Sequence, residues 1–260
     1  MKEVSEDQVI RCLQEVGLVT GDGVLVHSAI QYLGHPRNGP QTYLSALRQV
    51  IGPEGTLAVP AFNFAFAHEG RYDSLNTPSD GMGVFSEYVR QQPGAQRTPH
   101  PMQSLAVLGR YAEDLAARDT LSAFDPGSAF EQMLELDFKL LLLGADIWAS
   151  SIFHYSEQRL NVPYRYWKDF RGMVRTGEGW QEKTYRMYVR DPEINPQLTA
   201  DPVQKLLKER SLWRSVSFNY GEISSCRLKE FTSAVDYFLS ADPWSLVTNR
   251  PVQQSNEIDA

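Results

Sequence analysis

The stretch Leu140-Leu141-Leu142-Leu143, closed by Gly144, decides the fold class of this chain. Four consecutive apolar residues are typical of a strand that is covered on both faces, as in a parallel sheet between two layers of helices. Three further short apolar stretches predict strands at residues 23–26, 56–59 and 105–108. The first of them runs directly into His27-Ser28, which places two polar side chains at the end of a buried strand.

Apolar residues three and four positions apart alternate with these strands and predict amphipathic helices. Ser5 can cap the first helix and Gly17 stops it, while Ser128 with Glu131 forms a capping-box pattern before a later one. The predicted helices lie near residues 9–16, 43–51, 84–89, 130–134 and 151–160. This alternation predicts an α/β fold with a three-layer-like, partly parallel sheet core and helices on both faces.

The pattern changes after Pro163. Residues 173–175 and 183–190, joined by a glycine-containing loop, predict a β-hairpin, and a second strand pair is predicted at residues 216–220 and 222–228. Helical patterns follow at residues 201–210 and 230–239. The polar tail after Pro251 is predicted to be loose. We therefore expect a C-terminal region that contains a β-hairpin.

Composition excludes several classes of protein. The 260 residues suit one large domain, and 42% hydrophobic residues allow a core that needs no disulfide or metal. The net charge is −7 and no dense Lys/Arg run occurs, which argues against nucleic-acid binding. An acidic chain could attract a cationic substrate, although the charge can equally serve solubility alone.

The N-terminus and the cysteines predict a location. The first eight residues are polar and charged, unlike a signal peptide, and no apolar run is long enough to span a bilayer. Cys12 and Cys226 match no CxxC or zinc spacing, so reduced thiols in a cytoplasmic protein are the simplest account.

His154 and Glu157 are the first candidates for chemistry. They follow the four-leucine strand, and a spacing of three places both side chains on one face of a helix. A carboxylate beside an imidazole can fix its tautomer and raise its basicity, as a general base requires. The alternative is a surface histidine, with Glu157 paired to Arg159 or Arg165.

Two other segments carry weaker signals. Prolines on both sides of His100 stiffen the segment from Arg97 to Ser104, which predicts either a substrate wall or an ordinary turn. Backbone amides after His27-Ser28-Ala29 could hold phosphate oxygens. The alternating Phe62, Phe64 and Phe66 could line a pocket or join the core. No GxSxG, HExxH, GxGxxG or Walker motif occurs, and the five histidines show no metal-ligand spacing.

Taken together, these segments resemble the aminoglycoside 3-N-acetyltransferase family. The resemblance runs from about Val24 to Arg165. It rests on the order of several short segments: Leu25-Val26-His27-Ser28-Ala29, Gly52-Pro53-Glu54-Gly55-Thr56-Leu57, Arg97 to Ser104, Gly127-Ser128-Ala129-Phe130-Glu131 and Ser151-Ile152-Phe153-His154-Tyr155-Ser156-Glu157. The last segment is similar to the family's TxxHxxE motif, with Ser151 in place of the usual threonine.

The resemblance implies a fold unlike that of the GCN5-type acetyltransferases and direct transfer of acetyl from acetyl-CoA to an amine, with no metal. It implies His154 as general base, Glu157 as its support and Ser151 near the thioester. It implies CoA contacts at His27, Ser28, Ala29, Phe62 and Ser104, and acceptor contacts at Arg97 and His100. Residues 1–165 would form the acetyl-CoA-binding and catalytic core, and residues 166–260 the acceptor side of the same fold.

Three alternatives stay open. The acceptor could be an aminoglycoside, or an amino-sugar nucleotide or related metabolite, since residues 167–260 show little resemblance to the antibiotic-resistance members. The protein could instead be a metal-dependent hydrolase using the same His and acidic residues, or a non-catalytic CoA- or sugar-binding module. We expect a small-molecule partner, no nucleic acid and no membrane, and a homodimer as the simplest assembly.

Overall fold

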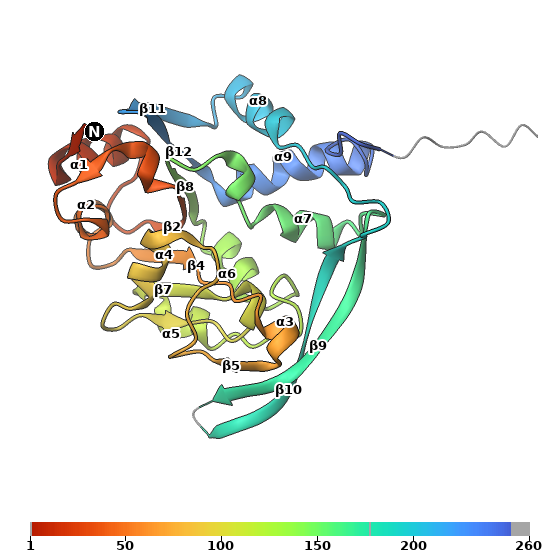
Figure 1. Cartoon of the computed structure of the whole chain (residues 1–260). Coiled ribbons are helices and arrows are strands. Elements are labelled where there is room, and N and C mark those ends of the chain that lie inside the picture. Colours follow the sequence, from red (N-terminus) through yellow and green to blue (C-terminus); the bar gives the residue numbers. More distant parts are fainter. Residues whose placement is uncertain (1, 177, 251–260) are drawn as a thin grey trace, which may run out of the picture.

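The computed structural model describes residues 2–176 and 178–250; the tail predicted to be loose lies outside them. A seven-stranded sheet in the order β11-β12-β8-β2-β4-β7-β6 forms the centre (Figure 1). β2 pairs in parallel with β4 and β8, and the other neighbours pair antiparallel, so the predicted partly parallel sheet is confirmed. The strands are β2 Gly23–Ser28, β4 Thr56–Pro60, β6 Gln96–Arg97, β7 Leu105–Gly109, β8 Lys139–Leu143, β11 Arg214–Phe218 and β12 Gly221–Arg227.

Helices cover both faces of this sheet. One layer consists of α1 Glu6–Glu15, α2 Pro40–Ile51 and α4 Gly83–Arg90. The other consists of α5 Ala112–Ala116, α6 Ala129–Glu135, α7 Phe153–Arg159, α8 Asp201–Glu209 and α9 Leu228–Ala241. Alternation along the strands explains the two cores: Leu140 and Leu142 join the second layer, whereas Leu141 and Leu143 join the first. The four-leucine run is therefore a strand buried on both sides, as predicted.

A long two-stranded ribbon leaves this body and curves along one side of it (Figure 1). It consists of β9 Arg165–Thr176 and β10 Gly179–Arg190, paired antiparallel, with the short strand β5 Arg71–Asp73 parallel to β9. The predicted hairpin is confirmed, but its first strand begins eight residues earlier than residues 173–175 suggested. Its base is rich in exposed aromatic and charged side chains, which conceal the strand in a search for apolar runs.

Smaller elements complete the chain. β1 Glu3–Val4 pairs with β3 His35–Pro36, α3 is Phe66–Glu69, and three 3-10 turns are η1 Ile30–Leu33, η2 Pro101–Gln103 and η3 Ile147–Ala149. A third, small core of Phe66, Tyr72, Met102, Val174 and Tyr185 holds the ribbon against α3 and β5. Hence the ribbon is anchored by packing along its middle as well as by its hydrogen bonds to β5.

The carboxyl ends of the central strands meet at one edge of the sheet. β2 ends at Ser28, β4 ends at Pro60, and β8 ends at Leu143, from which η3 leads into α7. In α/β sheets this edge is where ligand sites form, because loops and helix termini converge there. The residues that the sequence analysis selected on β2 and α7 lie at this edge.

β2 packs closely against its neighbours at Gly23. A Cβ at this position would lie 2.1 Å from Cε1 of the buried Phe138 ring. We expect Gly23→Ala to lower the free energy of unfolding by about 1–3 kcal/mol, as overpacking does, measured by urea denaturation. In the Phe138→Leu background the same change should cost less, because leucine lacks the colliding ring edge. Simple additivity of the two changes would contradict this account.

Candidate active site

A cavity of about 430 Å³ opens at this edge of the sheet. Its polar side comes from the carboxyl end of β2 and from the start of α7 with the residues before it, including His27, Ser28, Ser151 and His154. Its apolar side is formed by Pro60, Phe62, Phe64, Met82 and Trp148. The cavity therefore combines an apolar channel with a few converging polar groups, which is the usual character of a small-molecule site.

A buried carboxylate joins the candidate base to an arginine. Glu157 is fully buried, and its Oε2 lies 2.5 Å from His154 Nδ1 and 2.8 Å from Arg165 Nη2. Arg165 starts β9 and also donates from Nη1 to the Tyr188 carbonyl oxygen at 3.0 Å. Glu157 therefore pairs with both His154 and Arg165, which the sequence analysis treated as alternatives.

These contacts determine which nitrogen of His154 is available. Burial alone would raise the pKa of Glu157, but His154 and Arg165 outweigh it and keep the carboxylate ionised, so it only accepts and Nδ1 carries the proton between them. Nε2 of the neutral ring then keeps a free lone pair, and about a third of the side chain remains exposed. Burial and the positive charge of Arg165 lower the pKa of His154 below 6.5, against the opposing effect of Glu157. His154 is therefore a neutral, accessible base at pH 7.

A second histidine orients Ser151. The Ser151 backbone N–H donates to His27 Nε2 at 3.3 Å, and Ser151 Oγ lies 3.2 Å from the same nitrogen. Burial, and then the charge of His154, lower the pKa of His27 to about 3, so this ring is neutral and carries its proton on Nδ1. In this tautomer Nε2 accepts from both the backbone N–H and the hydroxyl of Ser151, so the hydroxyl can turn its proton to a ligand while the backbone bond still holds the residue.

The N-terminus of α4 forms another polar wall. Gly81, Met82 and Gly83 line the cavity, and within the described ranges no side chain caps this helix. Its first amides are therefore free to bind an anion. Ser86 and Ser150 also line the cavity, and their buried Oγ atoms have no hydrogen-bond partner among the residues that the structure describes. Such unpaired groups are costly unless a ligand or water satisfies them.

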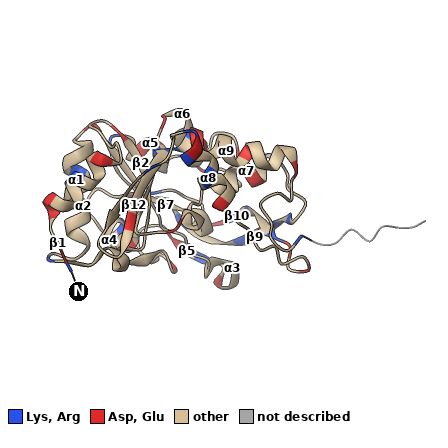
Figure 2. Cartoon of the chain, turned by 90° about the horizontal axis from the view of Figure 1, so that it is seen from above, with Lys and Arg blue, Asp and Glu red and all other residues tan. Residues whose placement is uncertain are grey.

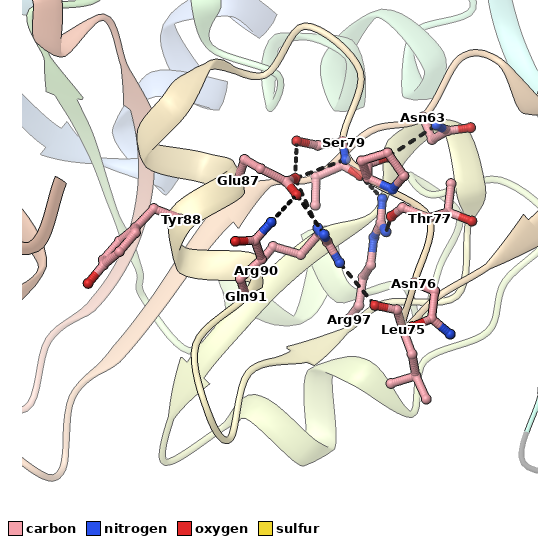
Figure 3. Close-up of polar contacts among 12 residues, drawn as sticks. Asn63, Leu75, Asn76, Thr77, Ser79, Glu87, Tyr88, Arg90, Gln91 and Arg97 are labelled. Carbon is pink, nitrogen blue, oxygen red and sulfur yellow. Dashed lines mark hydrogen bonds and ion pairs between the residues drawn. The ribbon is translucent and has the colours of Figure 1, made fainter. Parts of the chain in front are cut away.

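The segment that leads into α4 is held by partly buried charges (Figure 3). Glu87 accepts from the Ser79 backbone N–H at 3.0 Å and pairs with Arg90 at 2.6 Å. Burial alone would raise the pKa of Glu87, but the bonds from Arg90 and Ser79 outweigh it and lower the pKa to about 2. Arg97 donates to Ser104 Oγ and to the carbonyl oxygens of Ala61 and Thr77. Arg97 thus fixes two loops beside the cavity.

His100 is enclosed by protein. Its Nδ1 accepts from the Gln103 N–H at 3.2 Å, so its Nε2–H donates to the Arg186 carbonyl oxygen at 3.2 Å. Burial lowers its pKa to about 4, against the hydrogen bond to Arg186. The ring also contacts Tyr185 edge-on, at 5.0 Å between centroids. In this position His100 ties the ribbon to η2.

The structure brings most of the predicted site residues together. His27, Ser28, Phe62, Ser151 and His154 line one cavity, and Glu157 supports His154 from behind. Within the described chain, Ala29, Arg97, His100 and Ser104 are not part of its lining. The sequence analysis missed Gln31, Trp148, Ser86 and the α4 terminus. The closely spaced Gly81 and Gly83 before a helical pattern were the available signal for that terminus.

Two further findings concern residues 2–176 and 178–250. No group of three or more His, Cys, Asp or Glu side chains in these ranges is arranged to hold a metal ion. In the same part of the chain, no helix is both long enough and apolar enough to cross a membrane.

The fold and the site define a mixed α/β protein in which a buried glutamate holds a cavity-lining histidine at the carboxyl end of the parallel strands. The sequence model of the aminoglycoside 3-N-acetyltransferase family matches residues 25–240. The chain belongs to this family, as the resemblance indicated.

Curated relatives agree with this assignment. Aminoglycoside N(3)-acetyltransferase III of Salmonella sp is 29% identical over 185 residues, which cover 63% of each chain. Aminoglycoside N(3)-acetyltransferase VII of Streptomyces paromomycinus is 30% identical over 186 residues, 64% of this chain and 65% of that protein. The chain thus spans less than two thirds of the length of these relatives.

Solved structures show the same fold over nearly the whole chain. AAC-IIIb in its binary complex with CoASH has a TM-score of 0.83 and 23% identity, covering 96% of this chain and 100% of that one. Sisomicin-bound AAC-VIa has a TM-score of 0.80 and 21% identity, covering 92% and 99%. The expected α/β architecture with its C-terminal hairpin, unlike GCN5-type enzymes, is confirmed.

The burial of His100 predicts a pH effect on stability. Its folded pKa of about 4 lies below the ordinary 6.5, so below pH 6.5 the unfolded chain takes up a proton that the folded protein refuses. From pH 7 to 5, this residue should remove about 2 kcal/mol of stability. His100→Asn should be less stable at pH 7 but lose less on acidification, measured by urea denaturation at both pH values. Identical pH dependence in the two proteins would contradict this account.

Proposed function

We propose that this protein is an acetyl-CoA-dependent N-acetyltransferase that acylates a primary amine of an amino-sugar-like small molecule by direct transfer. The observation that carries the proposal is the His154–Glu157 pair, whose free Nε2 faces a cavity with an apolar wall and unpaired donors. Family membership and the CoASH complex of a protein with the same fold support acetyl-CoA as the donor.

The cavity fits the reactive arm of acetyl-CoA. A pantetheine arm is narrow and largely apolar, and Phe62, Met82 and Trp148 offer it a matching wall. The unpaired hydroxyls of Ser86 and Ser150 would bind its amide groups. The free amides at the start of α4, near Ser28, would hold phosphate oxygens.

The chemistry follows from the protonation state of His154. An alkylammonium has a pKa near ~10 and cannot attack a thioester until it loses a proton. The ammonium first releases one proton to solvent, and His154 Nε2 takes the second, directly or through a water molecule, as the amine nitrogen bonds to the acetyl carbon. The C–S bond then breaks, and the departing CoA thiolate takes this proton from the imidazolium. Glu157 stabilises the imidazolium formed in between.

Ser151 has a separate role in this mechanism. As the carbonyl carbon becomes tetrahedral, its oxygen acquires negative charge and needs donors placed in advance. The Ser151 hydroxyl would supply one by turning its proton from His27 Nε2 to the oxyanion, while the backbone N–H remains bonded to His27. Serine retains the hydroxyl of the family's usual threonine, so the substitution preserves this donor.

The acceptor is proposed by class only. The relatives' names and the sisomicin-bound structure indicate aminoglycosides, and amino-sugar nucleotides or related metabolites are the alternative acceptors. The proposal includes a cytoplasmic location, where the unpaired thiols of Cys12 and Cys226 are stable, and a homodimer as the assembly.

His154→Ala should separate catalysis from binding. We expect turnover to fall by ~10²-fold or more, because the amine loses its proton acceptor, while CoA affinity by calorimetry stays close to that of the wild type. Turnover is followed by release of the CoA thiol over a panel of amino sugars. A wild-type protein that binds no CoA would refute the proposed function, and a fully active His154→Ala variant would refute the role of His154.

Arg165 predicts the shape of the pH profile. Its positive charge lowers the pKa of His154, and a base acts only when neutral, so kcat/KM should fall as the pH drops through a value below 6.5. In Arg165→Gln this acidic limb should move to higher pH, whereas Arg165→Lys, which keeps the charge, should resemble the wild type. A profile that stays in place in Arg165→Gln would show that the arginine is structural only.

A further inference from the structure

The β9–β10 ribbon has the opposite charge to the rest of the protein. Its two strands carry seven Lys or Arg and two Asp or Glu, in a chain whose net charge is −7 (Figure 2). The cations are Arg165, Lys168, Arg171, Arg175, Lys183, Arg186 and Arg190. A surface of this sign beside the candidate base will affect which amines can approach it.

Most of these cations already have a partner. The ion pairs are Arg165–Glu157, Arg171–Glu182, Arg175–Asp73, Lys183–Asp119 and Arg186–Asp169. Only Lys168 and Arg190 have no carboxylate partner among the residues that the structure describes. The unpaired positive charge of the ribbon therefore resides on these two side chains.

Arg190 is the one beside the candidate base. The ladder places it directly opposite Arg165, so the two side chains share one face of the ribbon. Arg165 contacts His154, and the charge of Arg190 adds to that of Arg165 in lowering the pKa of His154. Lys168 lies on the other face, opposite Met187. An exposed guanidinium with no carboxylate partner in the described residues is thus the cross-strand neighbour of the arginine that contacts His154.

Aromatic rings continue the same face. Two residues along the ladder, Trp167 lies opposite Tyr188 with their rings 4.9 Å apart, and the next pair is Asp169–Arg186. The Arg186 guanidinium lies 5.7 Å from the Trp167 ring. Trp167 is 42% exposed, so its surface is available for a sugar ring or a base. A cation followed by an exposed ring suits a cyclic ligand with an anionic substituent.

Nearby carboxylates are not free to receive a cationic acceptor. Asp119 pairs with Lys183 and accepts from the Tyr185 hydroxyl at 3.0 Å. Asp125 accepts from the Ser122 N–H and from the Gln158 amide, both at 2.9 Å. The loop carrying them is bound to the ribbon by the Arg186 N–H, which donates to the Leu121 carbonyl oxygen. Both of these acids are engaged within the protein.

We propose that the acceptor is an amino sugar bearing a phosphate group, with Arg190 binding the phosphate and Trp167 covering the ring. This inference rests on the proposed N-acetyltransferase function and narrows its substrate class. Arginine suits phosphate because its planar fork donates two parallel hydrogen bonds. A polycationic aminoglycoside would instead meet the positive charge of Arg190, which disfavours it.

The test compares kcat/KM for glucosamine, glucosamine 6-phosphate, a uridine-diphosphate-linked amino sugar and kanamycin. Assays run at pH 8, where His154 is neutral in every variant. We expect a phosphorylated amine to be preferred over glucosamine by roughly 10- to 100-fold, the contribution of a charge-assisted hydrogen bond, and the preference to shrink as salt increases. The phosphorylated amine with the higher kcat/KM shows whether the phosphate belongs to a sugar monophosphate or to a nucleotide sugar.

Two variants connect the preference to the ribbon. Arg190→Gln should lower the selectivity for the phosphorylated amine over glucosamine by roughly 10-fold or more, and Arg190→Lys should restore part of it. Lys168→Gln removes the other unpaired charge from the opposite face and is the matched control, with selectivity expected to remain that of the wild type.

The outcomes separate the two proposals. Preference for kanamycin or glucosamine, or unchanged selectivity in Arg190→Gln, would overturn the phosphate inference while leaving acetyl transfer intact. Equal losses of selectivity in Lys168→Gln and Arg190→Gln would also overturn it, because they would indicate a general electrostatic attraction and not a specific contact with Arg190. CoA binding without acetylation of any amine in the panel would instead contradict the proposed function.

Discussion

The buried carboxylate of Glu157 is the constraint on which the rest of the site depends. A fully buried charge is tolerated only when it is paired and hydrogen-bonded, and one oxygen of Glu157 meets both an imidazole and a guanidinium. Those partners come from α7 and from the first residue of β9, so the same oxygen joins the helix behind the cavity to the base of the ribbon. The orientation of His154 and the position of the acceptor-side surface are thereby coupled. Loss of Glu157 would disturb both at once.

As the proposed general base, His154 needs two opposing influences on its protonation, and this arrangement supplies them. A general base must be neutral before the reaction and stabilised once it holds the proton. Burial and Arg165 act on the first requirement, because both lower the pKa of the imidazole. Glu157 acts on the second, because its charge lies 2.5 Å from Nδ1 and favours the imidazolium. A histidine–glutamate pair without the arginine would be protonated more readily and would supply less free base at neutral pH.

Local sequence patterns predicted the features that depend on residues close together in the chain. The four-leucine run became a doubly covered strand, and the spacing of His154 and Glu157 placed them on one helix face. The sequence could not decide between His154 and Arg165 as partners of Glu157, because one carboxylate oxygen can accept from both only after α7 and β9 have docked. Arg97 and His100 looked like substrate contacts because they are polar residues in a stiff loop. Their burial against loop carbonyls and the ribbon depends on chain segments as far away as Ala61 and Arg186.

The ribbon shows why family membership and substrate need separate arguments. The family model covers both the residues around His154 and the β9–β10 ribbon, so membership by itself does not distinguish one acceptor amine from another. Under the proposed assignment the acceptor approaches over β9 and β10, whose register places a pair of cations, a pair of aromatic rings and an ion pair in succession on one face. Because strand residues alternate between faces, exchanging a few of these side chains would change the charge offered to the acceptor without disturbing the ladder. On this proposal, substrate preference changes on the ribbon while Glu157 keeps His154 in the same orientation.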